Sequence, residues 1–174
     1  GGICDVGDDF LPALRMGIEK TTGIPGDHVL VNASHTHPPG RIICQDKVLL
    51  DRVHGTVCRA AADLEAVRVG AGVGHESRVT VNRTLRMKDG SHWTVRHTNP
   101  SPPDDQVAAV GPTDPQIGVL RFDRADGSPL ALIYNFACHP LFGDPAGGVT
   151  ANFVGVASSC IEAMLGHGAT ALFL

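Results

Sequence analysis

Two apolar segments joined by a short turn constrain this fold more than any other feature of the sequence. Residues 117–123 and 130–137 are both rich in β-branched and aliphatic side chains, and Arg124-Ala-Asp-Gly127 lies between them. An Asp-Gly pair between alternating apolar runs is typical of a β-hairpin, because the tight turn needs a residue that accepts positive φ. The sequence therefore predicts an antiparallel pair of strands at 117–123 and 130–137.

Helices and strands are predicted on both sides of this hairpin. Apolar residues at helical spacing (Phe10, Leu14 and Ile18) predict a helix over 10–22, with Asp8 or Asp9 as its cap and Gly23 at its end. The same patterns predict further helices over 45–66 and 151–165, and strands over 28–33, 67–75, 79–81 and 169–174. Strands that alternate with helices at both ends, around a hairpin, predict an α/β fold with a mixed β-sheet flanked by helices.

Length and composition limit the function classes. The 174 residues form one expected α/β domain, 1–174, and 43% hydrophobic residues can supply its core. The net charge of -4 and the scattered basic residues do not indicate a basic surface for binding nucleic acid. Five widely spaced cysteines without a C-x-x-C pair match neither a zinc ribbon nor a disulfide framework, so most are expected to be buried apolar residues.

Histidines follow two of the predicted strands. His35 and His37 come after the apolar run at 29–31, and His139 comes directly after 130–137. Residues two apart on a strand point to the same side, so His35 and His37 can reach one cavity. Imidazole is a common zinc ligand. The simpler interpretation is a polar strand end that faces solvent.

Two common metal-hydrolase patterns do not fit these histidines. A His-x-His-x-Asp-His loop needs an aspartate soon after His37, where the chain has Pro38, Pro39 and Gly40. An amidohydrolase barrel places His-x-His on its first strand and needs more strands than this sequence contains.

A third pattern covers nearly the whole chain. Its motifs occur in the order Thr-Gly-Ile-Pro-Gly-Asp-His-Val-Leu-Val (22–31), Asn-Ala-Ser-His-Thr-His (32–37), Val-Asn-Arg-Thr (81–84), Asn-Phe-Ala-Cys-His-Pro (135–140), Thr-Ala-Asn-Phe-Val-Gly (150–155) and Gly-Ala-Thr-Ala-Leu-Phe-Leu (168–174). In this order the sequence resembles the neutral/alkaline (non-lysosomal) ceramidase family. The resemblance implies that residues 1–174 are part of a larger catalytic domain.

The resemblance also implies an activity and a site. The family hydrolyses the amide bond of ceramide to sphingosine and a fatty acid with one zinc ion, Zn2+. By similarity, His35 and His139 are zinc ligands, His37 lies beside the metal as a catalytic and substrate-binding residue, and Arg83 binds the polar head of the substrate. The family's other ligands, a Glu and a Tyr, and its serine lie further along the chain. A lipid amide substrate, peripheral membrane contact and a secreted or periplasmic location are the corresponding expectations.

The sequence departs from the family pattern at two places. Pro38-Pro39-Gly40 stands where Ser-Gly-Pro is usual, and Asn152 stands where an acidic residue is usual. Two alternatives therefore stay open: a non-catalytic relative that keeps the fold, and a metallohydrolase of non-lipid amides. Cys138 adjoins His139, and strand alternation predicts that it packs behind the site.

Overall fold

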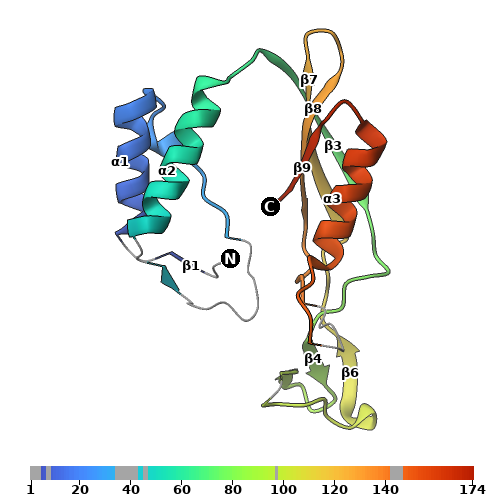
Figure 1. Cartoon of the computed structure of the whole chain (residues 1–174). Coiled ribbons are helices and arrows are strands. Elements are labelled where there is room, and N and C mark those ends of the chain that lie inside the picture. Colours follow the sequence, from blue (N-terminus) through green and yellow to red (C-terminus); the bar gives the residue numbers. More distant parts are fainter. Residues whose placement is uncertain (1–4, 7–8, 34–42, 45–46, 97, 142–146) are drawn as a thin grey trace.

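The computed structural model describes residues 5–6, 9–33, 43–44, 47–96, 98–141 and 147–174. Figure 1 shows a pair of helices, a sheet with a third helix on one face, and a small second sheet below it. The elements in chain order are β1 (Asp5–Val6), α1 (Phe10–Thr22), η1 (Gly26–His28), β2 (Ile43–Cys44), α2 (Lys47–Ala62), β3 (Val67–His75), β4 (Thr84–Met87), β5 (His92–Thr94), η2 (Asp104–Gln106), β6 (Val107–Val110), β7 (Gln116–Arg124), β8 (Pro129–Phe136), α3 (Asn152–Leu165) and β9 (Thr170–Phe173).

The larger sheet has the strand order β3-β7-β8-β9. β3 pairs with β7 and β7 pairs with β8 in antiparallel orientation, whereas β8 and β9 are parallel. The chain leaves β8 and returns through α3 to β9, as a parallel pair requires a crossover connection. The predicted α/β fold with a mixed sheet is therefore confirmed.

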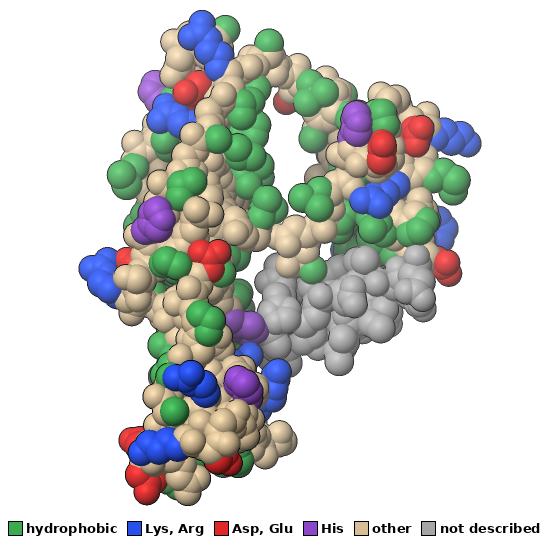
Figure 2. Space-filling view, turned by 180° about the vertical axis from the view of Figure 1, so that it is seen from behind, with side chains coloured by type: hydrophobic (Ala, Val, Ile, Leu, Met, Phe, Trp, Pro, Cys, Tyr) green, Lys and Arg blue, Asp and Glu red, His purple; other side chains and the backbone are tan. Residues whose placement is uncertain are grey.

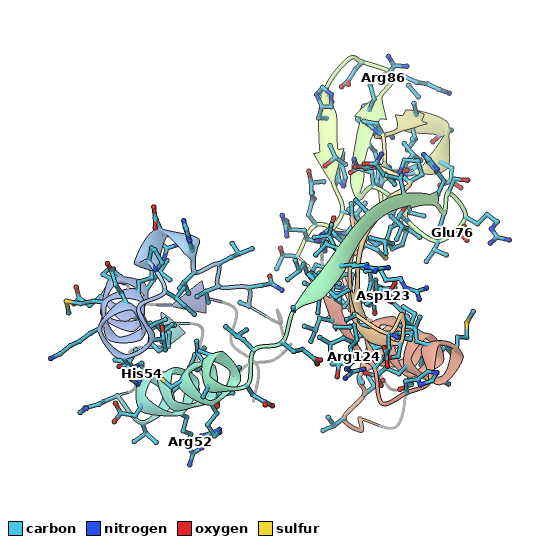
Figure 3. The ribbon with its side chains drawn as sticks, turned by 90° about the horizontal axis from the view of Figure 1, so that it is seen from above. Arg52, His54, Glu76, Arg86, Asp123 and Arg124 are labelled. Carbon is cyan, nitrogen blue, oxygen red and sulfur yellow. The ribbon has the colours of Figure 1, made fainter. Side chains whose placement is uncertain are left out.

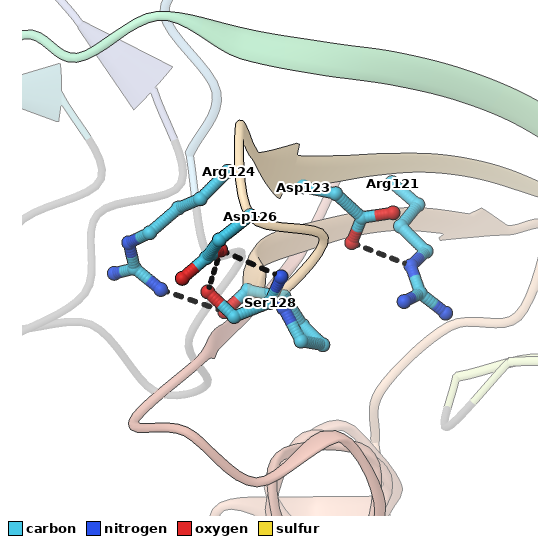
Figure 4. Close-up of polar contacts among 6 residues, drawn as sticks. Arg121, Asp123, Arg124, Asp126 and Ser128 are labelled. Atoms are coloured by element: carbon cyan, nitrogen blue, oxygen red, sulfur yellow. Dashed lines mark hydrogen bonds and ion pairs between the residues drawn. The ribbon is translucent and has the colours of Figure 1, made fainter.

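The predicted hairpin is β7–β8, and its turn is held by polar contacts (Figure 4). The carboxylate of Asp126 accepts hydrogen bonds from the backbone N–H and the hydroxyl of Ser128, at 2.9 and 2.7 Å. These bonds lower the pKa of Asp126. Arg124 donates to the carbonyl of Pro129 across the turn at 2.9 Å. Gly127 has φ +85°, a conformation that favours glycine, which explains the Asp-Gly pair.

Helix α3 covers one face of the larger sheet. The Tyr134 hydroxyl donates to the carbonyl of Val154 at 3.1 Å and shares a 2.9 Å hydrogen bond with Ser158. Phe153 on the helix makes edge contacts with Phe136 and Phe173 of the sheet, at centroid distances of 6.4 and 5.8 Å. These aromatic contacts fix the helix against the ends of β8 and β9.

The opposite face of the sheet is apolar and exposed. Strand register puts Val69, Leu120 and Leu172 on this face, where they are 60%, 41% and 50% exposed. Figure 2 shows hydrophobic side chains along the side of the sheet that faces the helix pair. The chain exposes 12044 Å² in all, whereas a compact monomer of this mass exposes about 8,100 Å². Much of the apolar sheet surface therefore stays in contact with solvent.

Helices α1 and α2 pack together away from the sheet (Figure 1). Helix α1 has the predicted bounds, and Gly23 ends it by donating to the carbonyl of Glu19 at 2.9 Å. Asp9 is the N-cap residue, but its side chain makes no capping hydrogen bond, so that part of the prediction is wrong. The alternative cap, Asp8, lies outside the described residues.

The described part of α2 is shorter than the predicted helix 45–66, because the chain leaves the helix after Ala62. Leu64 is 76% exposed, so it adds nothing to the apolar stripe that would extend the helix. Figure 3 shows His54 on α2 near α1 and Arg52 on the outer side. The His54 ring lies 3.1 Å from the Thr21 hydroxyl and 3.5 Å from the Cys58 sulfur.

The predicted strand at 28–33 is wrong. Residues 26–28 form a 3-10 helix, and residues 29–33 follow without strand pairing. Arg15 uses two nitrogens to bind the Val29 carbonyl, at 3.1 and 2.8 Å, and Val29 and Val31 pack on the helix pair. Val29 and Val31 are therefore partly buried against the helices instead of joining a sheet, whereas Leu30 between them is 80% exposed.

The small sheet, with order β5-β4-β6, was not predicted. Its first strand begins at Thr84, so the predicted strand at 79–81 is wrong, and that segment runs as an irregular connection from β3 to β4. The lone tryptophan of the sequence, Trp93, belongs to this sheet and donates to the carbonyl of Pro100 at 2.9 Å. No helix in the described residues is long and apolar enough to cross a membrane.

Candidate functional site

A cavity of about 220 Å³ lies where the end of β8 meets the connection from β3 to β4. Two short segments line it, one on either side. They contribute Val79, Thr80, Val81 and Arg83 from the connection, and Ala137, Cys138, His139 and Leu141 from the chain after β8.

The connection leaves β3 through a charged turn. Glu76 accepts hydrogen bonds from the backbone N–H and from the guanidinium of Arg78, with 2.8 Å for each of the two bonds to one carboxylate oxygen. The hydrogen bonds to the Arg78 side chain and backbone lower the pKa of Glu76 to about 2. Glu76 is thus ionised over the whole physiological pH range. The turn, at which Figure 3 labels Glu76, leads into the segment that lines the cavity.

His139 is on the cavity wall, three residues beyond the end of β8 at Phe136. Two tight turns shape this segment: the Cys138 N–H donates to the Phe136 carbonyl at 2.7 Å, and the Leu141 N–H donates to the His139 carbonyl at 2.9 Å. His139 is exposed as well as part of the cavity lining. The other predicted histidines, His35 and His37, lie outside the described residues.

Arg83 lines the same cavity as His139, although the two residues are far apart in sequence. Its side chain is exposed, and no hydrogen bond or ion pair of its guanidinium is seen with the residues that the structure describes. Other arginines do have such partners, for example Arg124 with Glu65 at 3.1 Å. An unpaired guanidinium has five donors for an oxygen-rich ligand group.

Thr80 adds a polar group that the sequence did not reveal. Its hydroxyl oxygen is buried and has no hydrogen-bond partner among the residues that the structure describes. A buried hydroxyl without a partner costs about 1–3 kcal/mol, so native proteins usually satisfy it with protein, water or ligand. The Thr80 hydroxyl is therefore a candidate to bond a group that enters the cavity.

Cys138 lines the cavity together with His139, so the prediction that it packs behind the site is wrong. Strand alternation does not apply here, because β8 ends at Phe136 and the following residues turn. Partial burial raises the pKa of the Cys138 thiol. The thiol therefore stays protonated at neutral pH and is a poor nucleophile.

This state of Cys138 is testable by thiol labelling. We expect iodoacetamide at pH 7.5 to modify exposed Cys160 at least about five times faster than Cys138, because only the thiolate reacts and Cys138 is partly buried. Mass spectrometry of the two peptides over time measures both rates in one sample. Equal rates, or faster labelling of Cys138, would contradict the burial seen here.

The described residues contain only part of what a metal site needs. They include no group of three or more His, Cys, Asp and Glu side chains that could hold a metal ion. His139 is a chemically suitable zinc ligand that faces a cavity. A metal ion held by His139 would need further ligands from outside the described residues, where His35 lies.

A second cavity of about 270 Å³ lies on the small sheet, between the β4–β5 turn and η2. Its wall mixes Lys88 with Asp89 and Asp105. Asp89 already accepts two hydrogen bonds from Ser91, at 2.9 and 2.7 Å, which lower its pKa. The cavity at His139 is the stronger candidate, because it brings together a histidine and an arginine that the motifs select and the buried hydroxyl of Thr80.

The fold and this cavity define an α/β chain with polar residues gathered beyond the end of a central strand. Among solved structures, the chain is similar to neutral ceramidase from Pseudomonas aeruginosa, with a TM-score of 0.55 and 24% sequence identity over 92% of this chain. The likeness extends to 28% of that protein's length, so this chain spans under a third of it. No protein-family model matches the sequence, and no curated protein matches it.

Proposed function

We propose that this chain carries part of the active site of a zinc-dependent amidohydrolase that cleaves the N-acyl bond of ceramide or a related lipid amide. One observation supports this most directly. Arg83 and His139, which the motifs select independently, line one cavity at the end of a central strand. The fold likeness to a neutral ceramidase agrees with the proposal.

Each residue has a distinct role in this proposal. His139 and His35 hold zinc, which when bound polarises an amide carbonyl and lowers the pKa of a water ligand. His37 exchanges a proton with the reacting groups. Arg83 donates hydrogen bonds to oxygens of the substrate's polar part, and the Thr80 hydroxyl gains a partner on the substrate.

The apolar part of the cavity wall favours a lipid amide over a small polar amide. Val79, Val81 and Leu141 are 50%, 76% and 45% exposed, although all three line the cavity. Exposed aliphatic side chains beside a guanidinium suit a ligand that has both an aliphatic chain and a polar head. No acidic side chain lines this cavity in the described residues, so a cationic ligand gains nothing there.

The test pairs metal analysis with hydrolysis. We expect near-stoichiometric zinc in the full-length protein, and release of fatty acid from a long-chain ceramide in preference to a short-chain, water-soluble amide such as N-acetylethanolamine. Arg83→Ala should raise KM about tenfold with little change in kcat, because about 1.4 kcal/mol of substrate binding is lost.

Arg86→Ala is the matched control for Arg83→Ala. Arg86 is an exposed arginine on β4, which Figure 3 shows on the part of the molecule that carries the small sheet, and it does not line the cavity. The KM of the Arg86→Ala variant should equal that of the wild type. A protein that contains zinc but prefers the short-chain amide would favour the non-lipid amidase, and a protein with neither zinc nor hydrolysis would refute the proposed enzyme.

A further inference from the structure

Arg83 lies at the centre of a turn that its neighbour closes. The side-chain oxygen of Asn82 accepts a hydrogen bond from the backbone N–H of Thr84 at 2.8 Å. This is the bond of an Asx turn, in which an asparagine side chain takes the place of a backbone carbonyl. Its effect is to fix the backbone on both sides of Arg83.

The same asparagine fastens this turn to a second segment. Its side-chain nitrogen donates to the Pro112 carbonyl at 2.7 Å, and the Gly111 N–H donates to the Thr84 carbonyl at 2.9 Å. The Arg83 carbonyl accepts from the Val95 N–H at 2.9 Å on the other side. The residues around Arg83 are therefore bonded to the residue that follows β5 and to the chain after β6.

The contact at Gly111 leaves no room for a side chain. A Cβ at this position would lie 2.7 Å from the Thr84 carbonyl oxygen and 2.8 Å from the Asn82 side-chain nitrogen. Separations this short to a backbone atom force the two segments apart. Only glycine allows residues 82–84 and 111–112 to approach as closely as they do.

We propose that Asn82 is the positioning residue for Arg83, and that it acts by clamping the Asx turn to the 111–112 segment. The clamp directs the Arg83 guanidinium into the cavity that His139 lines. This guanidinium has no partner among the described residues. A long side chain on a free connection loses much of its binding to conformational entropy, whereas a fixed base reduces that loss. The role in substrate binding rests on the proposed amidohydrolase function.

The first measurement compares Asn82→Ala with the wild type in KM, kcat and the NMR signal of the Arg83 Nε–Hε group. We expect KM to rise about five- to tenfold and kcat to stay within about twofold, because Arg83 then loses more conformational entropy when it binds the substrate. We also expect the Arg83 Nε–Hε signal, assigned with Arg83→Lys, to shift and to show greater mobility. Asn82→Ser keeps an acceptor for the Thr84 N–H, so its KM should lie between those of the wild type and Asn82→Ala.

A double-mutant cycle separates positioning from general damage to the fold. In an Arg83→Ala background, Asn82→Ala should change KM less than twofold, because the side chain that it positions is gone. Asn99→Ala is the control: Asn99 also bonds a backbone group of the small sheet, the Thr94 carbonyl at 2.8 Å, but it does not adjoin Arg83. It should leave KM and the Arg83 signal unchanged.

Each outcome decides the proposal. Equal KM and an unmoved Arg83 signal in Asn82→Ala would overturn the role of Asn82, even in an active enzyme. A KM effect of the same size in both backgrounds would assign Asn82 to general stability instead and would also overturn it. If the wild type hydrolyses no amide, the proposed function fails, and the Arg83 signal alone then decides whether Asn82 holds this side chain.

Discussion

Replacing His139 with alanine should abolish amide hydrolysis and zinc retention. We expect kcat/KM to fall at least about 1,000-fold, or about 4 kcal/mol of transition-state stabilisation, because zinc with one ligand fewer is lost or misplaced. His139 lines the cavity, is exposed and follows the end of β8, so the substitution removes the proposed ligand without removing a core residue. Elemental analysis and fatty-acid release, measured on the same preparation, check both losses.

His92→Ala is the control for this substitution. His92 is an exposed histidine on β5 and does not line the cavity, so zinc content and activity should equal those of the wild type. Circular dichroism should show the same helix content in both variants. An active, zinc-loaded His139→Ala protein would remove His139 from the metal site, and unequal effects of His35→Ala and His139→Ala would separate the two predicted ligands.

Elements whose signals are local were predicted well. Helix α1 and strand β3 have the predicted bounds, because the spacing of Phe10, Leu14 and Ile18 and the valines within 67–75 lie inside each element. The β7–β8 hairpin follows from the Asp-Gly turn between its strands. Such elements need no information about distant parts of the chain.

Elements that depend on a distant partner were predicted poorly. The segment 29–33 has the apolar pattern of a strand, but Arg15 binds its first carbonyl and helix α1 buries its valines. The segment 79–81 is also rich in β-branched residues, yet it lines a cavity without pairing. Strand propensity records a fit to a half-buried surface, and in both segments tertiary contacts decided which surface was used.

The candidate site divides in the same way. Arg83 and His139 were selected from motifs and the structure brings them to one cavity, whereas His35 and His37 stay predictions. Thr80 lies outside the motifs, and the Val-Asn-Arg-Thr motif assigned no role to Asn82, because their importance comes from a buried hydroxyl and from a close approach to Gly111. A glycine and an asparagine far apart in sequence gave no signal that they would meet.

The second large effect is expected in the helix pair. Leu14→Ala should destabilise the α1–α2 pair by about 3 kcal/mol, because Leu14 is 1% exposed and its loss leaves a cavity beside Phe10 and Ile18. Few side chains are this well buried in the described residues, so little else can compensate. Hydrogen exchange of α1 and α2 amides, and urea unfolding followed at 222 nm, measure the change.

Met16→Ala is the matched control on the same helix. Met16 is 69% exposed, so its truncation should change the free energy of unfolding by less than about 0.5 kcal/mol.

Trp93 fluorescence follows the small sheet in the same urea titration. A Leu14→Ala transition that moves at 222 nm but not at Trp93 would mean that the helix pair unfolds separately, whereas a common shift would mean that the two regions unfold together. Equal stability of the Leu14→Ala and Met16→Ala proteins would contradict the packing of α1 on α2, because only the buried leucine loses contacts with the facing helix.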